Sequence, residues 1–244
     1  MERVSAIILC EGETDQVLLG SYLEKKKGWK YLKPLKDSPF PNEPIVFFHN
    51  PSGEVLGIWP VGGNDFKPAI KSVFEREINE HSINKLVIVT DHDEFEGTER
   101  FTASLNVIND EIETNINTDI SLFQINCWNT IDFNNTFGDV CIDYLFLLIP
   151  LAETGALETF MLNTLSEQSV DKEHVIKEAR RFVKEFHSEK YLKRRREKTK
   201  AELGVALSVF SPDKVFTTMK EIIDSVDWSS FETANKQFKL LEEI

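Results

Sequence analysis

The stretch that decides the fold is residues 4–23, VSAIILCEGETDQVLLGSYL. Its first half, residues 4–10, is apolar at nearly every position and rich in β-branched side chains, which is typical of a buried parallel strand. From about Thr14 the apolar spacing becomes helical. The stretch therefore predicts a strand that leads through a tight turn into a helix.

Two carboxylates lie at this junction. Glu11 follows the predicted strand, and Asp15 lies in the first turn of the predicted helix. Open α/β sheets bind ligands at the edge where their strands end, so these side chains can converge on one ligand. A purely structural interpretation stays open, because acidic residues at a helix N-terminus are favoured by the macrodipole and Thr14 is an ordinary N-cap residue.

A second acidic cluster follows another apolar run, residues 85–90, which reads as a central parallel strand. In an extended chain residues two apart point the same way, so Asp91 and Asp93 can present their carboxylates together. Neighbouring buried carboxylates are unfavourable unless a cation neutralises them, and hard divalent ions such as Mg²⁺ take oxygen ligands. The alternative is a solvated acidic loop. Two such clusters at strand ends favour a metal site.

The order of these motifs resembles the Toprim domain, which topoisomerases, primases and OLD-type nucleases share. Its pattern is a strand, Glu-Gly, a helix and, after a later strand, Asp-x-Asp. Residues 11–12 and 91–93 match it, and Asp15 matches the extra acidic residue of the OLD-like branch. Gly155-Ala156-Leu157-Glu158 is similar to the Gly-x-Leu-Glu-like element of that branch, and Lys200 to its distal lysine. The resemblance covers roughly residues 1–165 well and the helical tail more loosely.

The resemblance implies a metal-dependent nuclease that hydrolyses DNA or RNA, in a setting such as anti-phage defence and with an ATPase as a partner protein. One or two Mg²⁺ or Mn²⁺ ions would be held by five acidic residues: Glu11, Asp15, Asp91, Asp93 and Glu158. Lys200 would offset charge that grows on the phosphate, and the catalytic set would be Glu11, Asp91, Asp93 and Lys200. The second motif lacks a third alternating Asp, which argues against topoisomerase and primase activity.

The net charge of −13 over 244 residues argues against a protein that coats nucleic acid by electrostatics alone. One dense basic run interrupts this acidic chain at residues 190–200, KYLKRRREKTK. Such a run is usually a solvated helix face, but beside a phosphodiester site it also fits a strip that grips a nucleic-acid backbone. The residues predicted to bind nucleic acid are Lys193, Arg194, Arg195 and Arg196.

Other features place the chain in a reducing cytoplasm, away from membranes. No run approaches the roughly 18 apolar residues of a membrane span, and residues 1–3 lack the layout of a signal peptide. The three cysteines, Cys10, Cys127 and Cys141, are scattered and form no Cys-x-x-Cys pair.

The predicted fold class is α/β: a Toprim- or Rossmann-like, mostly parallel sheet flanked by helices, with a helical C-terminal subregion. We predict a Toprim-like domain over residues 1–168 and a helical extension packed on it over residues 169–244. Strands are predicted over 4–10, 45–49, 55–60, 85–90, 120–128 and 139–149. Later helices are predicted over 66–79, 99–112, 152–165, 171–187, 201–210, 213–225 and 229–243.

Two alternative functions remain open. A Toprim-like shell can bind a nucleotide or a partner protein without turnover, as a regulatory module. Arg181 and His187 also match the loose spacing of the metal-free HEPN ribonucleases. The sequence contains no Walker A and no Gly-x-Gly-x-x-Gly motif, so any ATPase would be a separate chain. A homodimer is left open.

Overall fold

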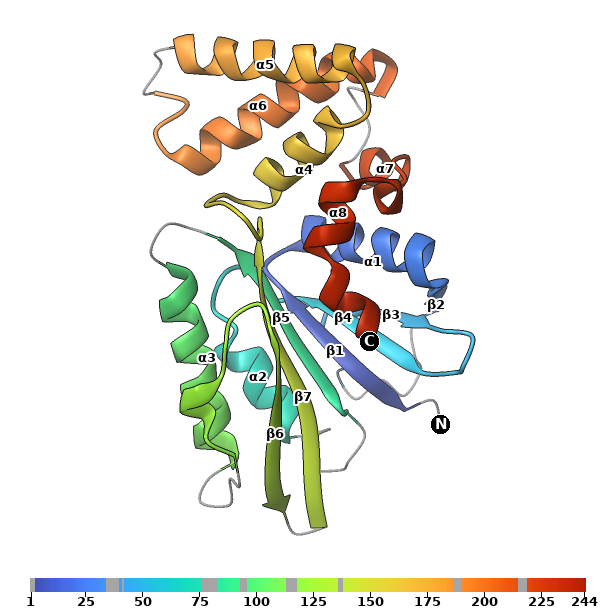
Figure 1. Cartoon of the computed structure of the whole chain (residues 1–244), viewed down its shortest axis with the longest axis vertical. Coiled ribbons are helices and arrows are strands. Elements are labelled where there is room, and N and C mark those ends of the chain that lie inside the picture. Colours follow the sequence, from blue (N-terminus) through green and yellow to red (C-terminus); the bar gives the residue numbers. More distant parts are fainter. Residues whose placement is uncertain are drawn as a thin grey trace.

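The computed structural model of the protein describes residues 3–33, 40, 42–75, 83–92, 96–112, 118–135, 138–186, 190–214 and 219–244. A seven-stranded sheet forms its centre, in the order β2-β3-β4-β1-β5-β7-β6. Helices cover both faces of the sheet, which confirms the predicted α/β fold (Figure 1). The strands are β1 Val4–Cys10, β2 Lys30–Leu32, β3 Val46–His49, β4 Val55–Pro60, β5 Lys85–Asp91, β6 Trp128–Asn135 and β7 Gly138–Ile149.

The four central strands, β4, β1, β5 and β7, run parallel, as predicted. The edges of the sheet are antiparallel: β2 pairs antiparallel with β3, β3 with β4, and β6 with β7. The predicted hairpin of residues 45–60 is confirmed as β3 and β4. In the centre, Cys10 at the end of β1 pairs with Val89, so β1 and β5 end at nearly the same level.

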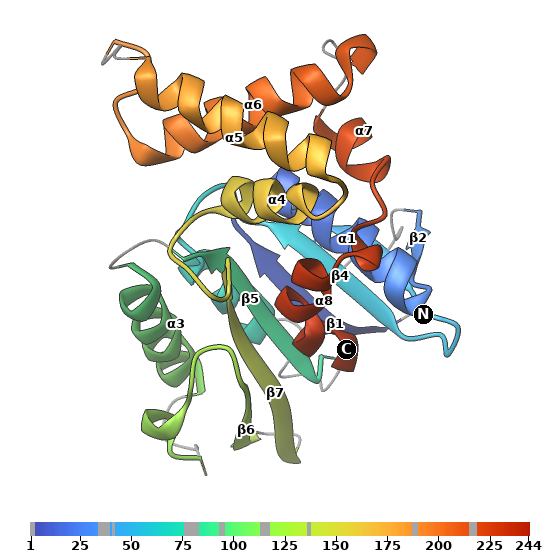
Figure 2. The same cartoon turned by 45° about the horizontal axis from the view of Figure 1, so that its top comes forward.

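The helices form three groups around the sheet. Helix α1 and the C-terminal α8 pack on one face, and α2 and α3 on the other (Figure 1). Helices α4, α5 and α6 stand over the carboxyl ends of the parallel strands (Figure 2). The α-helices are α1 Glu13–Lys27, α2 Lys67–Val73, α3 Glu96–Ile112, α4 Leu157–Ser166, α5 Val170–Glu185, α6 Arg195–Phe210, α7 Met219–Asp224 and α8 Glu232–Gln237.

The C-terminal residues complete the core beside α1. Phe238 is fully buried, and its ring centroid lies 4.9 Å from that of Tyr22 and 5.1 Å from that of Phe160. The Gln237 side-chain amide donates to the Leu148 carbonyl of β7. Elements on both sides of residue 168 therefore share one hydrophobic core, and the helical region is packed on the sheet.

The strand predicted over residues 120–128 is wrong. Residues Ile120–Leu122 form a 3-10 turn, η3, capped by the Asp119 carboxylate, which accepts from the Ser121 amide. The Asn129 side chain stabilises the turn that follows η3, because it donates to the carbonyls of Gln124 and Cys127. Such local side-chain hydrogen bonds compete with strand pairing. The edge strand is β6, which begins at Trp128 and pairs with β7.

Helices α4 and α8 are shorter than predicted, whereas α6 is longer and begins at Arg195 instead of residue 201. Helix α4 begins at Leu157 instead of residue 152, because residues 151–156 are irregular and the Gly155 amide donates to the carbonyl of His92, just after β5. The last segment is divided into short pieces by 3-10 turns, η4 Pro212–Lys214, η5 Trp228–Ser230 and η6 Lys239–Glu243. Within the described part of the chain, no helix has the length and apolar composition that a membrane crossing needs.

We predict that Phe238→Ala lowers the free energy of unfolding by about 3–5 kcal/mol, the usual cost of removing a buried aromatic ring. Urea denaturation followed by tryptophan fluorescence measures it. Phe182→Ala is the matched control, because that ring on α5 is 57% exposed and its loss should cost far less. Equal losses in the two variants would contradict the assignment of the C-terminal segment to the core.

Candidate functional site

The two acidic motifs meet at one edge of the sheet. Glu11 follows β1 directly, Asp91 is the last residue of β5, and these strands are parallel neighbours. The backbone amide of Asp91 donates to Glu11 Oε1 at 3.0 Å. The expected meeting of the motifs is therefore observed, while their role as metal ligands stays a prediction.

Glu11 is held by three donors on one of its two carboxylate oxygens. Besides the Asp91 amide, Thr90 Oγ1 donates to Glu11 Oε1 at 2.7 Å and Arg100 Nη1 at 2.9 Å. Burial alone would raise the pKa of Glu11, but these donors and the charges of Arg100 and Arg196 hold that pKa below its usual value. Glu11 therefore carries a fixed negative charge inside the protein.

The two carboxylate oxygens of Asp91 also differ in their contacts. Its Oδ1 accepts from the Leu157 amide at 3.0 Å, at the first turn of α4. Its Oδ2 is buried and accepts no hydrogen bond from the described residues. Burial, followed by the charges of Glu11 and Asp15, raises the pKa of Asp91 to about 8, although Arg196 and the Leu157 amide act in the opposite direction.

Asp15 lies in the first turn of α1, where it caps the helix and also lies at the acidic site. Its Oδ2 accepts from the Gly12 amide at 3.0 Å, so the structural interpretation of this residue is part of its role. The side chain is buried, however, and burial together with the Glu11 charge raises its pKa to about 7. An N-terminal carboxylate with only a capping role would be solvated and would keep a low pKa.

Arg196 bridges the two motifs. Its Nη2 lies 3.1 Å from Glu11 Oε2 and 2.8 Å from Asp91 Oδ2. The first contact is a hydrogen bond, whereas the second is an ionic contact without hydrogen-bond alignment. Each carboxylate thus has one oxygen fixed by donors and the other directed at the same guanidinium nitrogen. The two carboxylates therefore form a cation site, and the Arg196 guanidinium occupies it.

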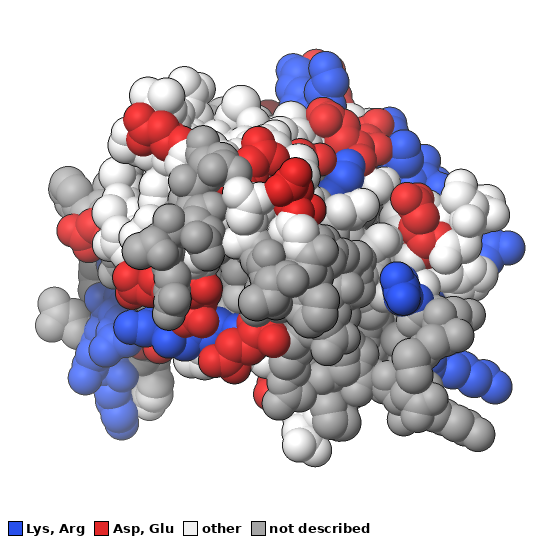
Figure 3. All heavy atoms as spheres, turned by 90° about the horizontal axis from the view of Figure 1, so that it is seen from below, with Lys and Arg blue, Asp and Glu red and all other residues white. Residues whose placement is uncertain are grey.

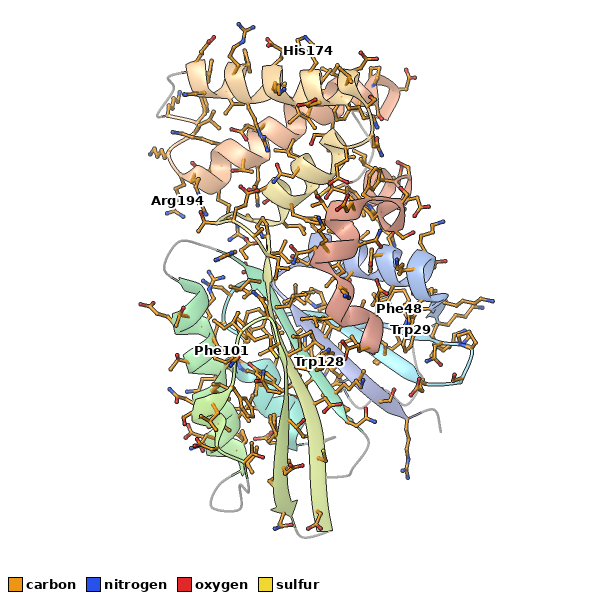
Figure 4. The ribbon with its side chains drawn as sticks, viewed as in Figure 1. Trp29, Phe48, Phe101, Trp128, His174 and Arg194 are labelled. Atoms are coloured by element: carbon orange, nitrogen blue, oxygen red, sulfur yellow. The ribbon has the colours of Figure 1, made fainter. Side chains whose placement is uncertain are left out.

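The other predicted residues surround this cation site. Glu158 lies in the first turn of α4, where Lys200 Nζ is 3.7 Å from its carboxylate, and its charge acts on both Asp15 and Arg196. Arg194 lies at the start of α6, toward the carboxyl ends of the strands (Figure 4). Lys193 and Arg195 are exposed beside it. Asp93 and His187 lie outside the described residues.

The described side chains fit a divalent ion in chemistry, though not in their present arrangement. Glu11 Oε2 and Asp91 Oδ2 are hard ligands, and the buried Asp91 Oδ2 accepts no hydrogen bond from the described residues. Within the described ranges, however, no three His, Cys, Asp or Glu side chains are grouped so as to hold a metal ion. The Arg196 side chain occupies the point on which Glu11 Oε2 and Asp91 Oδ2 converge.

The sequence motifs do not identify Arg100, the most buried of the described cations at the site. Its side chain is 9% exposed and contacts both Glu11 and Thr90. One signal was available, since Arg100 is the only Lys or Arg between Lys85 and Lys172. An isolated cation one helical turn after an acidic motif indicates a partner for that motif.

Two neighbouring features have structural roles. The amides of Gly62 and Gly63 donate to the Glu11 carbonyl at 3.0 and 2.9 Å, and both glycines have positive φ. This pair therefore forms the tight turn that supports Glu11, and these amides are not directed at a phosphate. The His92 ring contacts the Pro150 carbonyl through Nδ1 at 2.9 Å.

The clustering of charge at the carboxyl edge differs from the arrangement at the opposite end. Figure 3 shows the molecule from below, where the described Lys and Arg side chains lie in separate groups with Asp and Glu among them. At the carboxyl edge, by contrast, buried acids and arginines form one connected ion-pair network.

A protein-family model described as a protein of unknown function, DUF3226, matches residues 5–240. The chain belongs to this family. No curated protein shows a significant match to the chain. Among solved structures, this DUF3226 member is similar to hypothetical protein PH0156 from Pyrococcus horikoshii OT3, with 17% sequence identity and a TM-score of 0.47 over 99% of this chain and 98% of that one.

We predict that Asp15→Asn stabilises the metal-free protein at high pH. Because the pKa of Asp15 is raised, the folded protein holds a proton that the unfolded chain releases, so the wild type loses stability as pH rises from about 4 through about 7. One pKa unit corresponds to about 1.4 kcal/mol, so we expect the variant to gain on the order of 2–4 kcal/mol at alkaline pH. Urea denaturation in EDTA at about pH 5 and about pH 8.5 measures it.

Glu13→Gln is the matched control, because Glu13 lies in the same first turn of α1 but is exposed. Its effect on stability should be small at both pH values. An Asp15→Asn variant that is less stable than wild type at alkaline pH would show that the cap, and not the buried charge, dominates.

Proposed function

We propose that this DUF3226 protein is a metal-dependent nuclease of the OLD-like Toprim type, which hydrolyses phosphodiester bonds of DNA or RNA. The observation that carries the proposal is the pair of carboxylate oxygens, Glu11 Oε2 and Asp91 Oδ2, that converge on one cationic nitrogen. A binding module or a purely structural ion pair has no need to bury further acids beside such a pair. Asp15 and Glu158 nevertheless lie next to it.

Glu11, Asp91 and Asp15 would hold Mg²⁺ or Mn²⁺, with Glu158 and Asp93 as the remaining acidic candidates. Such ions would supply activation of the attacking water and stabilisation of the leaving oxygen. Arg100 keeps Glu11 ionised and oriented through its buried contact. Lys200, next to Glu158, is placed to offset charge that grows on the phosphate.

The Arg196 guanidinium has to move away from Glu11 and Asp91 before a metal ion can bind between these carboxylates. Its side chain is 48% exposed and reaches the site from the first turn of α6, so it can move into solvent without opening the core. By contrast, Arg100 is 9% exposed and is held by Thr90 as well as by Glu11. We therefore assign Arg100 as the permanent cation of the site and Arg196 as the exchangeable one. Once released, the guanidinium is available to bind a substrate phosphate.

Two rival functions are less well supported. A nucleotide- or partner-binding module would use the same edge of the sheet without turnover, but it would not need the additional acids Asp15 and Glu158, and an activity assay tests it directly. For the HEPN-type ribonuclease, Arg181 pairs with Glu178 on the exposed face of α5, and His187 lies outside the described residues. A cytoplasmic location, a role in defence and an ATPase partner belong to this proposal.

We expect the purified protein to cleave plasmid DNA or transfer RNA with Mg²⁺ or Mn²⁺ and not with EDTA. Asp91→Asn should lower the cleavage rate by at least about 100-fold, because it removes a ligand charge and keeps the side-chain shape. It should melt in EDTA at or above the wild-type temperature, since the buried charge is gone.

Asp139→Asn, at the exposed far end of β7, is the matched control and should cleave normally. Absence of metal-dependent cleavage of both substrates would contradict the nuclease. Normal cleavage by Asp91→Asn would place the chemistry elsewhere in the chain.

We also predict that Arg196→Gln tightens divalent-ion binding while it destabilises the metal-free protein. The wild-type ion must displace a guanidinium, whereas the variant has lost that competitor. We expect roughly tenfold tighter Mn²⁺ binding, which corresponds to about 1.4 kcal/mol. Isothermal titration calorimetry and melting temperatures with and without Mn²⁺ measure the two effects.

Arg194→Gln removes the same charge two residues earlier and serves as the control, because Arg194 has no ion pair with Glu11 or Asp91 in the described part of the chain. Its Mn²⁺ affinity should stay close to that of wild type. Weaker Mn²⁺ binding by Arg196→Gln than by Arg194→Gln would show that Arg196 and the ion do not share one site.

A further inference from the structure

A cavity lies near the acidic edge, among α4, α5 and α6. Its volume is about 410 Å³. Val183 forms its apolar part, and the remaining lining is polar. The polar residues are Thr159, Arg180, Lys184, Lys198, Thr199 and Glu202.

The charge of this lining is positive, in a chain whose net charge is −13. Arg180 is partly neutralised, because it lies 3.9 Å from Glu202 and donates to the Asn163 side chain at 2.8 Å. Lys184 comes from α5 and Lys198 from α6, and in the described ranges neither ammonium has a carboxylate within 4.0 Å. Two like charges that line one cavity repel each other, so an anion between them would be stabilised.

Thr159 adds a hydrogen-bond donor of the right kind. Its Oγ1 accepts from the Ala156 amide at 3.3 Å, which leaves the hydroxyl hydrogen available for a ligand. The Thr199 hydroxyl is already used, since it donates to the Arg195 carbonyl. The cavity therefore offers two lysine ammoniums, the partly neutralised Arg180 and one hydroxyl hydrogen to an anion with several acceptor oxygens, which is the chemistry of a phosphate group.

The position of the cavity connects it with the acidic edge. Thr159 follows Glu158 in α4, and Lys198 lies two residues before Lys200 in α6. Glu158 and Lys200 are in turn paired with each other. In both α4 and α6, a member of the Glu158–Lys200 pair therefore lies one or two positions from a residue that lines the cavity.

We infer that this cavity binds a phosphate of the nucleic-acid backbone close to the phosphate that is cleaved; the inference rests on the proposed nuclease function. In this proposal a nucleic-acid strand bound at the cavity continues toward the acidic edge that holds Glu11 and Asp91. The cavity contributes affinity and direction to the substrate without contacting the reacting atoms.

The test is the double variant Lys184→Gln/Lys198→Gln, with binding of a fluorescent single-stranded oligonucleotide measured in EDTA so that no cleavage occurs. We expect roughly tenfold weaker binding, and a log–log salt slope that is less steep by about 1.4, which is the change for two lost single-strand contacts. Lys177→Gln/Lys236→Gln is the matched control. It removes two exposed lysines that pair with Glu173 and Glu232, away from the cavity.

Melting curves show whether the double variant is folded, and Lys198→Gln alone provides a milder change with half the expected slope difference. Wild-type affinity and slope in the double variant would overturn the inference, and so would wild-type protein that binds no oligonucleotide. A loss that appears only with 5′-phosphorylated strands would also overturn it, because the cavity would then hold a terminal phosphate.

The binding test of the cavity and the cleavage test of the nuclease can fail independently. Weakened binding in the double variant supports the cavity even if the wild type shows no metal-dependent cleavage. Metal-dependent cleavage together with unchanged binding in the double variant would retain the nuclease and remove the cavity from its substrate path.

Discussion

The site depends on the register between two neighbouring parallel strands. Strands β1 and β5 end at nearly the same level. The side chain of Glu11, which follows β1, therefore lies next to that of Asp91, which ends β5. Both are carboxylates, and both are buried. Like charges in a poorly solvated place repel each other strongly, so other parts of the protein must supply compensation.

The compensation is of two kinds, and the difference between them gives the site its chemistry. Donors that are part of the framework hold Glu11 Oε1 and Asp91 Oδ1, namely the Thr90 hydroxyl, Arg100 and two backbone amides. The remaining two oxygens, Glu11 Oε2 and Asp91 Oδ2, contact Arg196. Removing one partner of a buried ion pair is costly, so some cation has to stay at that point. A divalent ion supplies more charge there than one guanidinium does.

The C-terminal helices are therefore part of the site as well as of the core. Helix α4 contributes the Leu157 amide and Glu158, and α6 contributes Arg196 and Lys200. Both helices pack into the hydrophobic core that α1 and the sheet form. The position of Arg196 thus depends on correct packing of the helical layer, and this couples the charge balance of the sheet edge to the cavity among α4, α5 and α6.

Several predictions from sequence depend only on near neighbours in the chain. The strand–turn–helix unit of residues 4–23 was predicted because its apolar period changes at the turn, and α1 ends where Gly28 takes a left-handed conformation. The two acidic motifs were predicted at one edge because both follow apolar strand runs. The strand over 120–128 failed for a local reason too, since Asp119 and Asn129 bond the backbone and outweigh the apolar pattern.

The sequence by itself determined the α/β class, the parallel centre of the sheet and the meeting of Glu11 with Asp91. Only the tertiary structure decided which cations neutralise them. Arg100 is 89 residues from Glu11 in the chain, and Arg196 is 185 residues away. In the sequence Arg196 is one of several basic residues, all compatible with a solvated helix face. Its role follows from the docking of α6 over the strand ends, because packing of distant apolar faces and not local spacing sets where a long side chain reaches.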